Sequence, residues 1–129
     1  MKGKKEKQTI GKIGEDIATK FLVKRDFVLL ERNYWKKFGE IDIIFRKNGK
    51  IHFVEVKTVS RETVPDEKID EYRPEDNIHS AKLKRIGRTI EAYLHEKDTN
   101  EDWEFHAVII LLDKDKKIAK VRFLRNLII

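Results

Sequence analysis

The sequence predicts an α/β fold, a mixed five-stranded sheet flanked by helices in the order α-β-β-β-α-β-β. Three observations support this fold class. Apolar residues recur at helical spacing in two separate segments, two alternating segments surround Asn48-Gly49, and residues 105–112 are continuously apolar. Because helical and strand patterns interleave along one chain, we expect the helices to pack on the sheet.

The length and composition suit one compact domain. The chain has 129 residues and is 40% hydrophobic, which is enough for a single core. We interpret residues 1–8, which are rich in lysine, as a flexible basic arm and residues 9–129 as one domain. No apolar run approaches the roughly 18 residues of a membrane span, no apolar signal segment is visible, and the chain has no cysteine. We therefore expect a cytoplasmic protein without a membrane partner.

The first half of the chain is expected to form a helix, a strand and a hairpin. A helix from Thr9, its expected N-cap, to about Lys24 is predicted by four apolar residues at helical spacing: Ile10, Ile13, Ile17 and Phe21. The apolar run 27–30 begins a first strand that ends near Asn33. Residues 40–46 and 51–58 alternate in polarity around Asn48-Gly49, which is typical of a two-residue hairpin turn. We expect Ile41, Ile43 and Phe45 to share one face of this hairpin.

The second half is expected to form a loop, a helix and two strands. The acidic stretch 61–73 reads as a long loop, and Pro74 fits the first turn of a second helix. The apolar stripe of that helix consists of Ile78, Ile86, Ile90 and Leu94. Residues 105–112 are typical of a strand buried on both faces, and residues 118–123 form the last strand.

The hairpin brings two carboxylates together. Counting outward from the turn places Asp42 directly across from Glu55, and Glu40 across from Lys57. Directly opposed residues share a face, with Cβ atoms about 4.5–5.5 Å apart. A divalent cation such as Mg²⁺ or Mn²⁺ would compensate the repulsion between Asp42 and Glu55, and so would a shared proton. The alternative is a salt-bridge cluster on a solvated face.

Two further residues extend this arrangement. Lys57 follows Glu55 on the same face and could supply positive charge near a reacting phosphate. Glu15 lies at the edge of the apolar face of the first helix, between the small residues Gly11 and Ala18, which would let it reach into a cleft. An ordinary flanking glutamate is the alternative. Gly14 inside the helix indicates tight packing or a close approach, because glycine disfavours helix by about 1 kcal/mol relative to alanine.

The charge distribution suits a polyanionic partner. The net charge is +6, yet residues 61–80 contain seven acidic and three basic side chains, so the rest of the chain is more basic than the total suggests. Lysine and arginine neutralise phosphates. Lys84, Arg88 and His95 share one helix face and could track a phosphate backbone, although a solvated surface explains the same pattern. The four histidines show no spacing typical of metal ligands: His52, His79, His95 and His106.

Several motifs together resemble the uncharacterised bacterial YraN family. The first group comprises Gly11-x-x-Gly14-Glu15-x-x-Ala18, Asn33-Tyr34, Gly39-Glu40-Ile41-Asp42 and Phe53-Val54-Glu55-Val56-Lys57-Thr58. The second comprises Pro74-Glu75, Lys82, Tyr93-Leu94 and Phe123-Leu124-Arg125-Asn126. The similarity extends over nearly the whole chain. The family is placed among nucleases with the PD-(D/E)xK site, which have a restriction-endonuclease-like core.

This resemblance implies a fold similar to that of archaeal Holliday junction resolvases. Asp42 and Glu55 would bind metal, Glu15 would join the metal site from its helix, and Lys57 would orient or activate the attacking water. Lys82 matches a motif position and, with Lys84 and Arg88, is a candidate contact to nucleic acid. By analogy with resolvases, which must cut two strands, a homodimer is suggested.

Two functions follow as hypotheses. The first is a Mg²⁺- or Mn²⁺-dependent endonuclease acting on DNA, favoured over RNA, at branched or otherwise non-duplex structures. The second is a nucleic-acid-binding module that keeps the nuclease fold with little or no catalysis.

Overall fold

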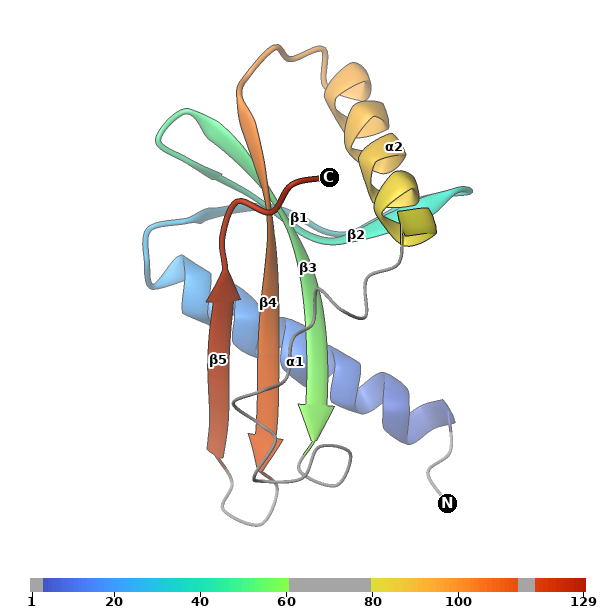
Figure 1. Ribbon diagram of the computed structural model, residues 1–129. Helices are drawn as coiled ribbons and strands as arrows, with labels where there is room; N and C mark the ends of the chain where they lie inside the picture. The colour runs from blue at the N-terminus through green and yellow to red at the C-terminus, as the bar shows by residue number, and fades with distance from the viewer. Residues whose placement is uncertain (1–3, 61–79, 114–117) are drawn as a thin grey trace.

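The computed structural model describes residues 4–60, 80–113 and 118–129, with side chains from residue 9 onward. The elements are α1 (Lys4–Val23), β1 (Val28–Lys36), β2 (Gly39–Lys47), β3 (Lys50–Ser60), α2 (Ser80–Glu96), β4 (Trp103–Asp113) and β5 (Ile118–Leu124). The strands form one sheet in the order β1-β2-β3-β4-β5, in which β3 and β4 are parallel and the other neighbours antiparallel (Figure 1). The predicted fold class and element order are confirmed. The predicted loop 61–73, Pro74 and Ile78 lie outside the described residues.

Helix α1 begins earlier than the sequence pattern predicts. Its first residue is Lys4, so residues 4–8 of the expected arm are helical and Thr9 lies inside the helix rather than at its N-cap. At its other end Asp26 has a left-handed φ of 69°, and the Phe27 amide donates to the Leu22 carbonyl at 3.1 Å. This is the Schellman arrangement that ends many helices. It turns the chain so that Phe27 is buried against the sheet.

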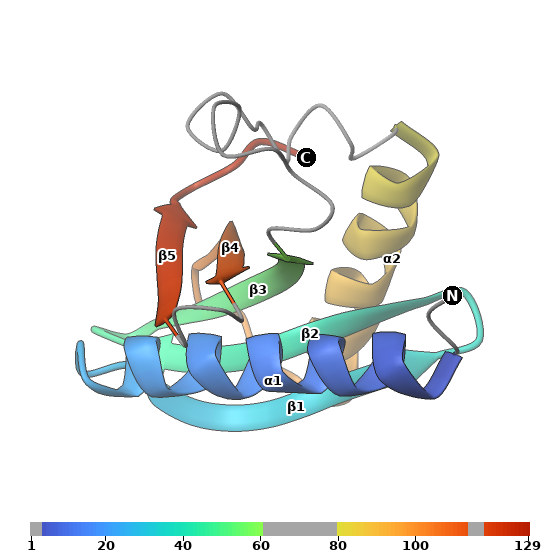
Figure 2. The same cartoon turned by 90° about the horizontal axis from the view of Figure 1, so that it is seen from below.

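The two helices cover opposite faces of the sheet (Figure 2). Ala18 and Leu22 of α1 belong to a core cluster with Ile43, Phe45, Val54, Val108 and Ile110. Ile86, Ile90 and Tyr93 of α2 belong to a second cluster with Tyr34, Ile41, Ile44, Ile51, Phe53 and Phe105. The predicted burial of residues 105–112 on both faces is confirmed for residues 105–111, because β4 contributes to clusters on both faces, whereas Leu112 is half-buried.

The hairpin turn is the one that the sequence predicts. Asn48 and Gly49 have positive φ angles of 53° and 74°, as a two-residue type I′ turn requires. The pairs from Lys47↔Lys50 to Ile43↔Val54 follow the predicted register.

Gly14 is required by the contact between α1 and β3. A Cβ atom at Gly14 would overlap the side chain of Thr58, whereas a Cβ atom at Gly11 would meet open space. We therefore expect Gly14→Ala to destabilise the protein by about 1–3 kcal/mol through overpacking. Gly11→Ala, the matched control on the same helix, should be neutral or stabilise by up to about 1 kcal/mol through helix propensity.

Urea unfolding followed by circular dichroism would measure both effects. Adding Thr58→Ala to Gly14→Ala should recover part of the lost stability, because it removes the overlapping hydroxyl. Equal unfolding midpoints for the two alanine variants would contradict the close contact.

Candidate active site

The candidate site lies where β2 separates from β3. The ladder between these strands ends at Ile43↔Val54, while β3 continues to pair with β4 as far as Ser60. The direct cross-strand pairs predicted from the register, Asp42 with Glu55 and Glu40 with Lys57, are therefore not formed as ladder pairs. Instead, Asp42 Oδ2 accepts a hydrogen bond of 2.8 Å from the Val56 amide. The Asp42 side chain thus takes the place of the missing strand partner.

A second irregularity lies beside this point, at Asn33 of β1. It has a left-handed φ of 53° and lies between the pairs Arg32↔Ile43 and Tyr34↔Ile41. Asparagine tolerates this conformation better than most residues. On the neighbouring strand β2, Ile41 packs in the α2 cluster, whereas Ile43 and Phe45 pack in the α1 cluster. The prediction that all three share one face is wrong.

The side chain of Asn33 connects Glu15 of α1 to Glu40 of β2. With its side-chain amide oriented to donate, Asn33 Nδ2 lies 3.1 Å from both Glu15 Oε1 and Glu40 Oε1. Arg32 approaches Glu15 at 3.5 Å and binds Asp16 more closely, at 2.8 Å. Asn33 therefore links Glu15 of α1 to Glu40 of β2, and the role of Glu15 as a metal ligand stays a prediction.

The carboxylates border a cavity between the sheet and α2. Its volume is about 210 Å³, and its lining residues are Gly39, Glu40, Asp42, Glu55, Lys82, Arg85 and Ile86. Lys82 Nζ forms an ion pair of 2.9 Å with Glu55 Oε1. The sequence predicts Lys82 as a contact to nucleic acid, whereas the structure places it beside a carboxylate of the candidate metal site.

The electrostatics of the cavity favour an added positive charge. Burial, together with the charges of Glu55, Glu15 and Glu40, raises the pKa of Asp42 to about 8, and the Val56 amide opposes that rise. Burial also raises the pKa of Glu40, helped by Glu15 and Glu55. At neutral pH Asp42 therefore holds a proton, and a cation bound there would displace it.

The remaining predicted residues lie around this cavity. Lys57 follows Glu55 by two residues on the same face of β3 and is exposed. Lys84 is exposed on α2, and the Arg88 guanidinium lies 4.3 Å from the centre of the Phe38 ring. Gly39 fits closely against α2, because a Cβ there would meet Thr89 Oγ1 and the Arg85 carbonyl. Asn33 is the principal residue that sequence reasoning left without a role.

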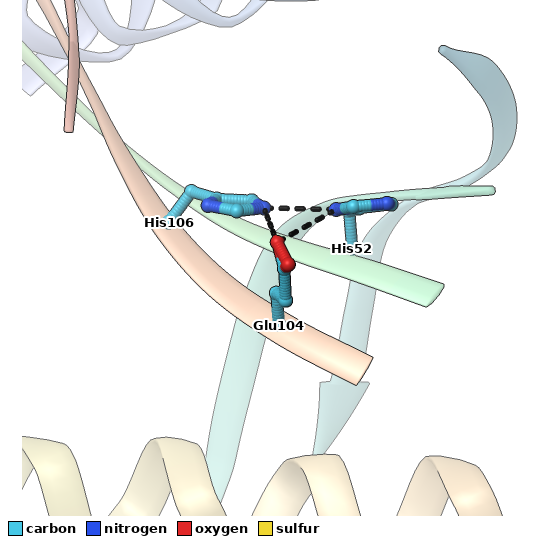
Figure 3. Close-up of side chains that lie close together, drawn as sticks. All are labelled: His52, Glu104 and His106. Atoms are coloured by element: carbon cyan, nitrogen blue, oxygen red, sulfur yellow. Dashed lines mark hydrogen bonds and ion pairs between the residues drawn. The ribbon is translucent and has the colours of Figure 1, made fainter. Parts of the chain in front are cut away.

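A second cluster contains two of the histidines that appear scattered in the sequence. His52 on β3 and His106 on β4 meet with Glu104, and their ligand atoms lie within 4.8 Å of one another, so the three side chains could hold a metal ion (Figure 3). The expectation that the histidines show no metal-ligand arrangement is corrected for this pair. His95 is exposed on α2, and His79 lies outside the described residues.

Hydrogen bonds within this cluster give it a structural role as well. The backbone N–H of Asn126 donates to His106 Nδ1 at 2.9 Å. The proton of a neutral His106 is therefore on Nε2. His106 Nε2 then donates to His52 Nδ1 at 2.9 Å, and His52 Nε2 donates to the Lys47 carbonyl at 3.3 Å. A metal ion on His106 Nε2 would require the opposite tautomer and would break the bond to Asn126. We therefore favour the histidine chain as a hydrogen-bond relay.

Within the described parts of the chain, no helix is long and apolar enough to cross a membrane.

The model of the family described as "Uncharacterised protein family UPF0102" matches residues 14–112. A UPF0102 protein of Campylobacter lari is 34% identical over 110 residues, which are 85% of this chain and 90% of that protein. A UPF0102 protein of Dictyoglomus turgidum is 36% identical over 118 residues, covering 91% and 94% of the two chains.

A UPF0102 protein of Campylobacter concisus is 40% identical over 101 residues, covering 78% of this chain and 81% of that protein. The matched region of the family model includes Gly14, Glu15, Asp42, Glu55 and Lys57, so it spans the whole candidate site. These matches agree with the family resemblance found in the sequence motifs. The chain belongs to the UPF0102 family.

Proposed function

We propose that this protein is a metal-dependent endonuclease that hydrolyses phosphodiester bonds in DNA, at branched or otherwise non-duplex structures. The observation that carries the proposal is that three carboxylates, those of Glu40, Asp42 and Glu55, line one cavity, and that Asn33 links Glu15 of α1 to Glu40. Carboxylates at this density repel one another unless they are protonated or share a cation. The net charge of +6 makes attraction of a nucleic acid favourable.

The donor set fits a hard divalent cation. Oxygen ligands from carboxylates suit Mg²⁺ or Mn²⁺ better than soft metals. Asp42 and Glu55 would hold the ion, and Glu15 would complete the set from α1. When bound, the ion would supply an activated water and neutralise charge on the phosphate.

The chain's own side chains would do the rest. Glu55 would exchange its ion pair with Lys82 for the metal, which frees Lys82 to bind a phosphate oxygen. Lys57, exposed on the face of Glu55, would stabilise the negative charge that develops on the phosphate. Lys84 and Arg88 of α2 would contact phosphates further along the strand.

The test is cleavage of a labelled panel: single strand, duplex, flap, four-way junction and RNA, with Mg²⁺, Mn²⁺ or EDTA. We expect metal-dependent cleavage of a non-duplex DNA. Lys57→Ala should lower that rate by about a hundredfold, the usual effect of removing a group that stabilises transition-state charge. Lys50→Ala, at the other end of the same strand, should retain the wild-type rate. Cleavage that survives in EDTA would refute the proposal.

A nucleic-acid-binding module is the second candidate function. It is supported by the contacts that satisfy the carboxylates without a metal, the Lys82–Glu55 ion pair and the Val56–Asp42 hydrogen bond. Salt-dependent binding of panel members with no cleavage in any metal would favour this function over the first. Asp42 and Glu55 would then be structural residues.

A further inference from the structure

Trp35 is exposed in a way that the fold does not explain. Its exposed fraction is 66%, and among the described residues it takes part in no ring contact. Trp103, the other tryptophan, is 39% exposed and packs edge-on against Phe53 at 5.9 Å between ring centroids. Tryptophan is enriched at binding interfaces, because its ring offers a large apolar face and a polar N–H group.

Trp35 lies at the tip of the β1–β2 pair, and this tip is held firmly against α2. Lys36 Nζ forms an ion pair of 2.8 Å with Glu96, and the Phe38 ring lies under the Arg88 guanidinium. Gly39 packs so closely on α2 that a side chain there would meet the Arg85 carbonyl. These contacts fix the tip, which extends beyond the body of the sheet in Figure 1. Because the backbone that carries Trp35 is already ordered, binding there costs little backbone entropy.

Trp35 also adjoins the acidic cavity. It is the direct cross-strand partner of Glu40, and Glu40 lines the cavity together with Asp42 and Glu55. Directly opposed side chains have Cβ atoms about 4.5–5.5 Å apart. A chain molecule bound at the carboxylates would therefore pass beside the indole ring.

We propose that Trp35 is a stacking platform for an unpaired base of a DNA strand whose phosphate lies at the acidic cavity, an inference that rests on the proposed function. The residues next to Trp35 in the strand pair are charged: Glu40 lies opposite it, and Lys36 and Lys37 follow it in the chain. The Lys36 side chain binds Glu96 of α2, whereas Lys37 is exposed. A protein interface has an apolar core, which these charged residues do not supply. A base face matches the indole ring, and Lys37 offers a positive charge for a phosphate.

A stacking platform at Trp35 would favour non-duplex DNA. Bases within a duplex are stacked on both sides, so they present no free face to an indole ring. A single strand, a flap or a branch point offers such a face without the cost of unstacking. Trp35 would therefore select the substrate, and the carboxylates would perform the chemistry.

Tryptophan fluorescence tests the platform without cleavage. In Trp103→Phe, Trp35 is the sole tryptophan of the chain, and oligodeoxynucleotides are titrated in EDTA. We expect quenching by a single strand and by a flap, and little quenching by a blunt duplex. With stacking worth about 1–3 kcal/mol, Trp35→Ala should weaken single-strand binding about tenfold and duplex binding less than about twofold. Trp35→Phe should restore most of the affinity.

Several outcomes would overturn the inference. Equal affinity losses for single strand and duplex would show a general contact, and unchanged affinity would show none. Self-association that disappears in Trp35→Ala would identify the ring as a contact between two copies of the chain. Tighter binding of RNA than of DNA would show that the ligand is RNA and not the proposed DNA strand. Since binding is read in EDTA, loss of cleavage in an active-site variant leaves this result unaffected, so the two proposals fail separately. Circular dichroism confirms that each variant is folded.

Discussion

Asp42→Asn is expected to lower the rate of metal-dependent DNA cleavage by at least about a thousandfold while making the metal-free protein more stable above pH 8. The two effects have one cause. The Asp42 carboxyl is buried beside Glu55, and these surroundings raise its pKa to about 8. An asparagine keeps an oxygen that can accept the Val56 amide hydrogen bond, and it removes the charge. It cannot replace a carboxylate as a ligand of Mg²⁺.

The direction of the pH dependence follows from the two states of Asp42. In the unfolded chain its pKa is near the ordinary 3.8, so the native state binds the proton more tightly. The resulting stabilisation is complete below about pH 4 and is lost as the pH rises through about 8. Wild type should lose stability over this interval, and Asp42→Asn should not. At pH 9 we expect the variant to be more stable by about 1–3 kcal/mol, a value reduced for partial solvation of the site.

Urea unfolding at pH 6 and pH 9 in EDTA measures the stability difference, and cleavage with Mn²⁺ measures the activity. Asp102→Asn, an exposed aspartate before β4, is the matched control and should change neither quantity. Metal binding by wild type should strengthen about tenfold per pH unit below pH 8, because one proton leaves Asp42 when the ion binds. If Asp42→Asn is inactive but no more stable than wild type at pH 9, Asp42 is needed for catalysis, but the inferred charge repulsion around it is wrong.

Local patterns predict the hairpin and part of its register. Asn48-Gly49 fixes the turn, and the turn fixes the register as far as Ile43↔Val54. These predictions hold because they depend on residues close in sequence. Beyond that point the predicted ladder pair of Asp42 and Glu55 is not formed, and Ile41 and Ile43 pack on opposite faces of the sheet, which no local pattern indicates.

Long-range contacts set the limit of prediction from the sequence. His52 and His106 are 54 residues apart, and they meet because β3 and β4, which α2 separates in the sequence, are parallel neighbours in the sheet. No local pattern specifies that register. The start of α1 was also missed, because the lysine-rich residues before Thr9 have no apolar spacing, yet the helix extends through them. Glu15 is a candidate from the sequence because its neighbours on the helix face, Gly11 and Ala18, are small.

His106→Ala is expected to destabilise the protein by about 3–5 kcal/mol, the largest effect on stability that we predict. The imidazole is fully buried and contacts the Phe123 ring, so its loss leaves a cavity. It also leaves the Asn126 amide without its acceptor and His52 Nδ1 without its donor. His95→Ala, an exposed histidine on α2, is the matched control and should change the stability by less than about 0.5 kcal/mol.

Acid should act on the same relay. Burial, with the charges of His52 and Arg125, lowers the pKa of His106 to about 4, while Glu104 opposes the shift. The unfolded chain, with a histidine pKa near 6.5, takes up the proton first, so this stabilisation is present above pH 6.5 and is lost as the pH falls through about 4. Unfolding measured from pH 7 to pH 4 should show a loss of about 2–3 kcal/mol in the free energy of unfolding that His106→Ala lacks.

The relay also predicts that Zn²⁺ leaves the melting temperature unchanged. A rise in melting temperature with Zn²⁺ that disappears in His52→Ala would instead identify the cluster as a metal site, because a ligand that binds only the native state stabilises it.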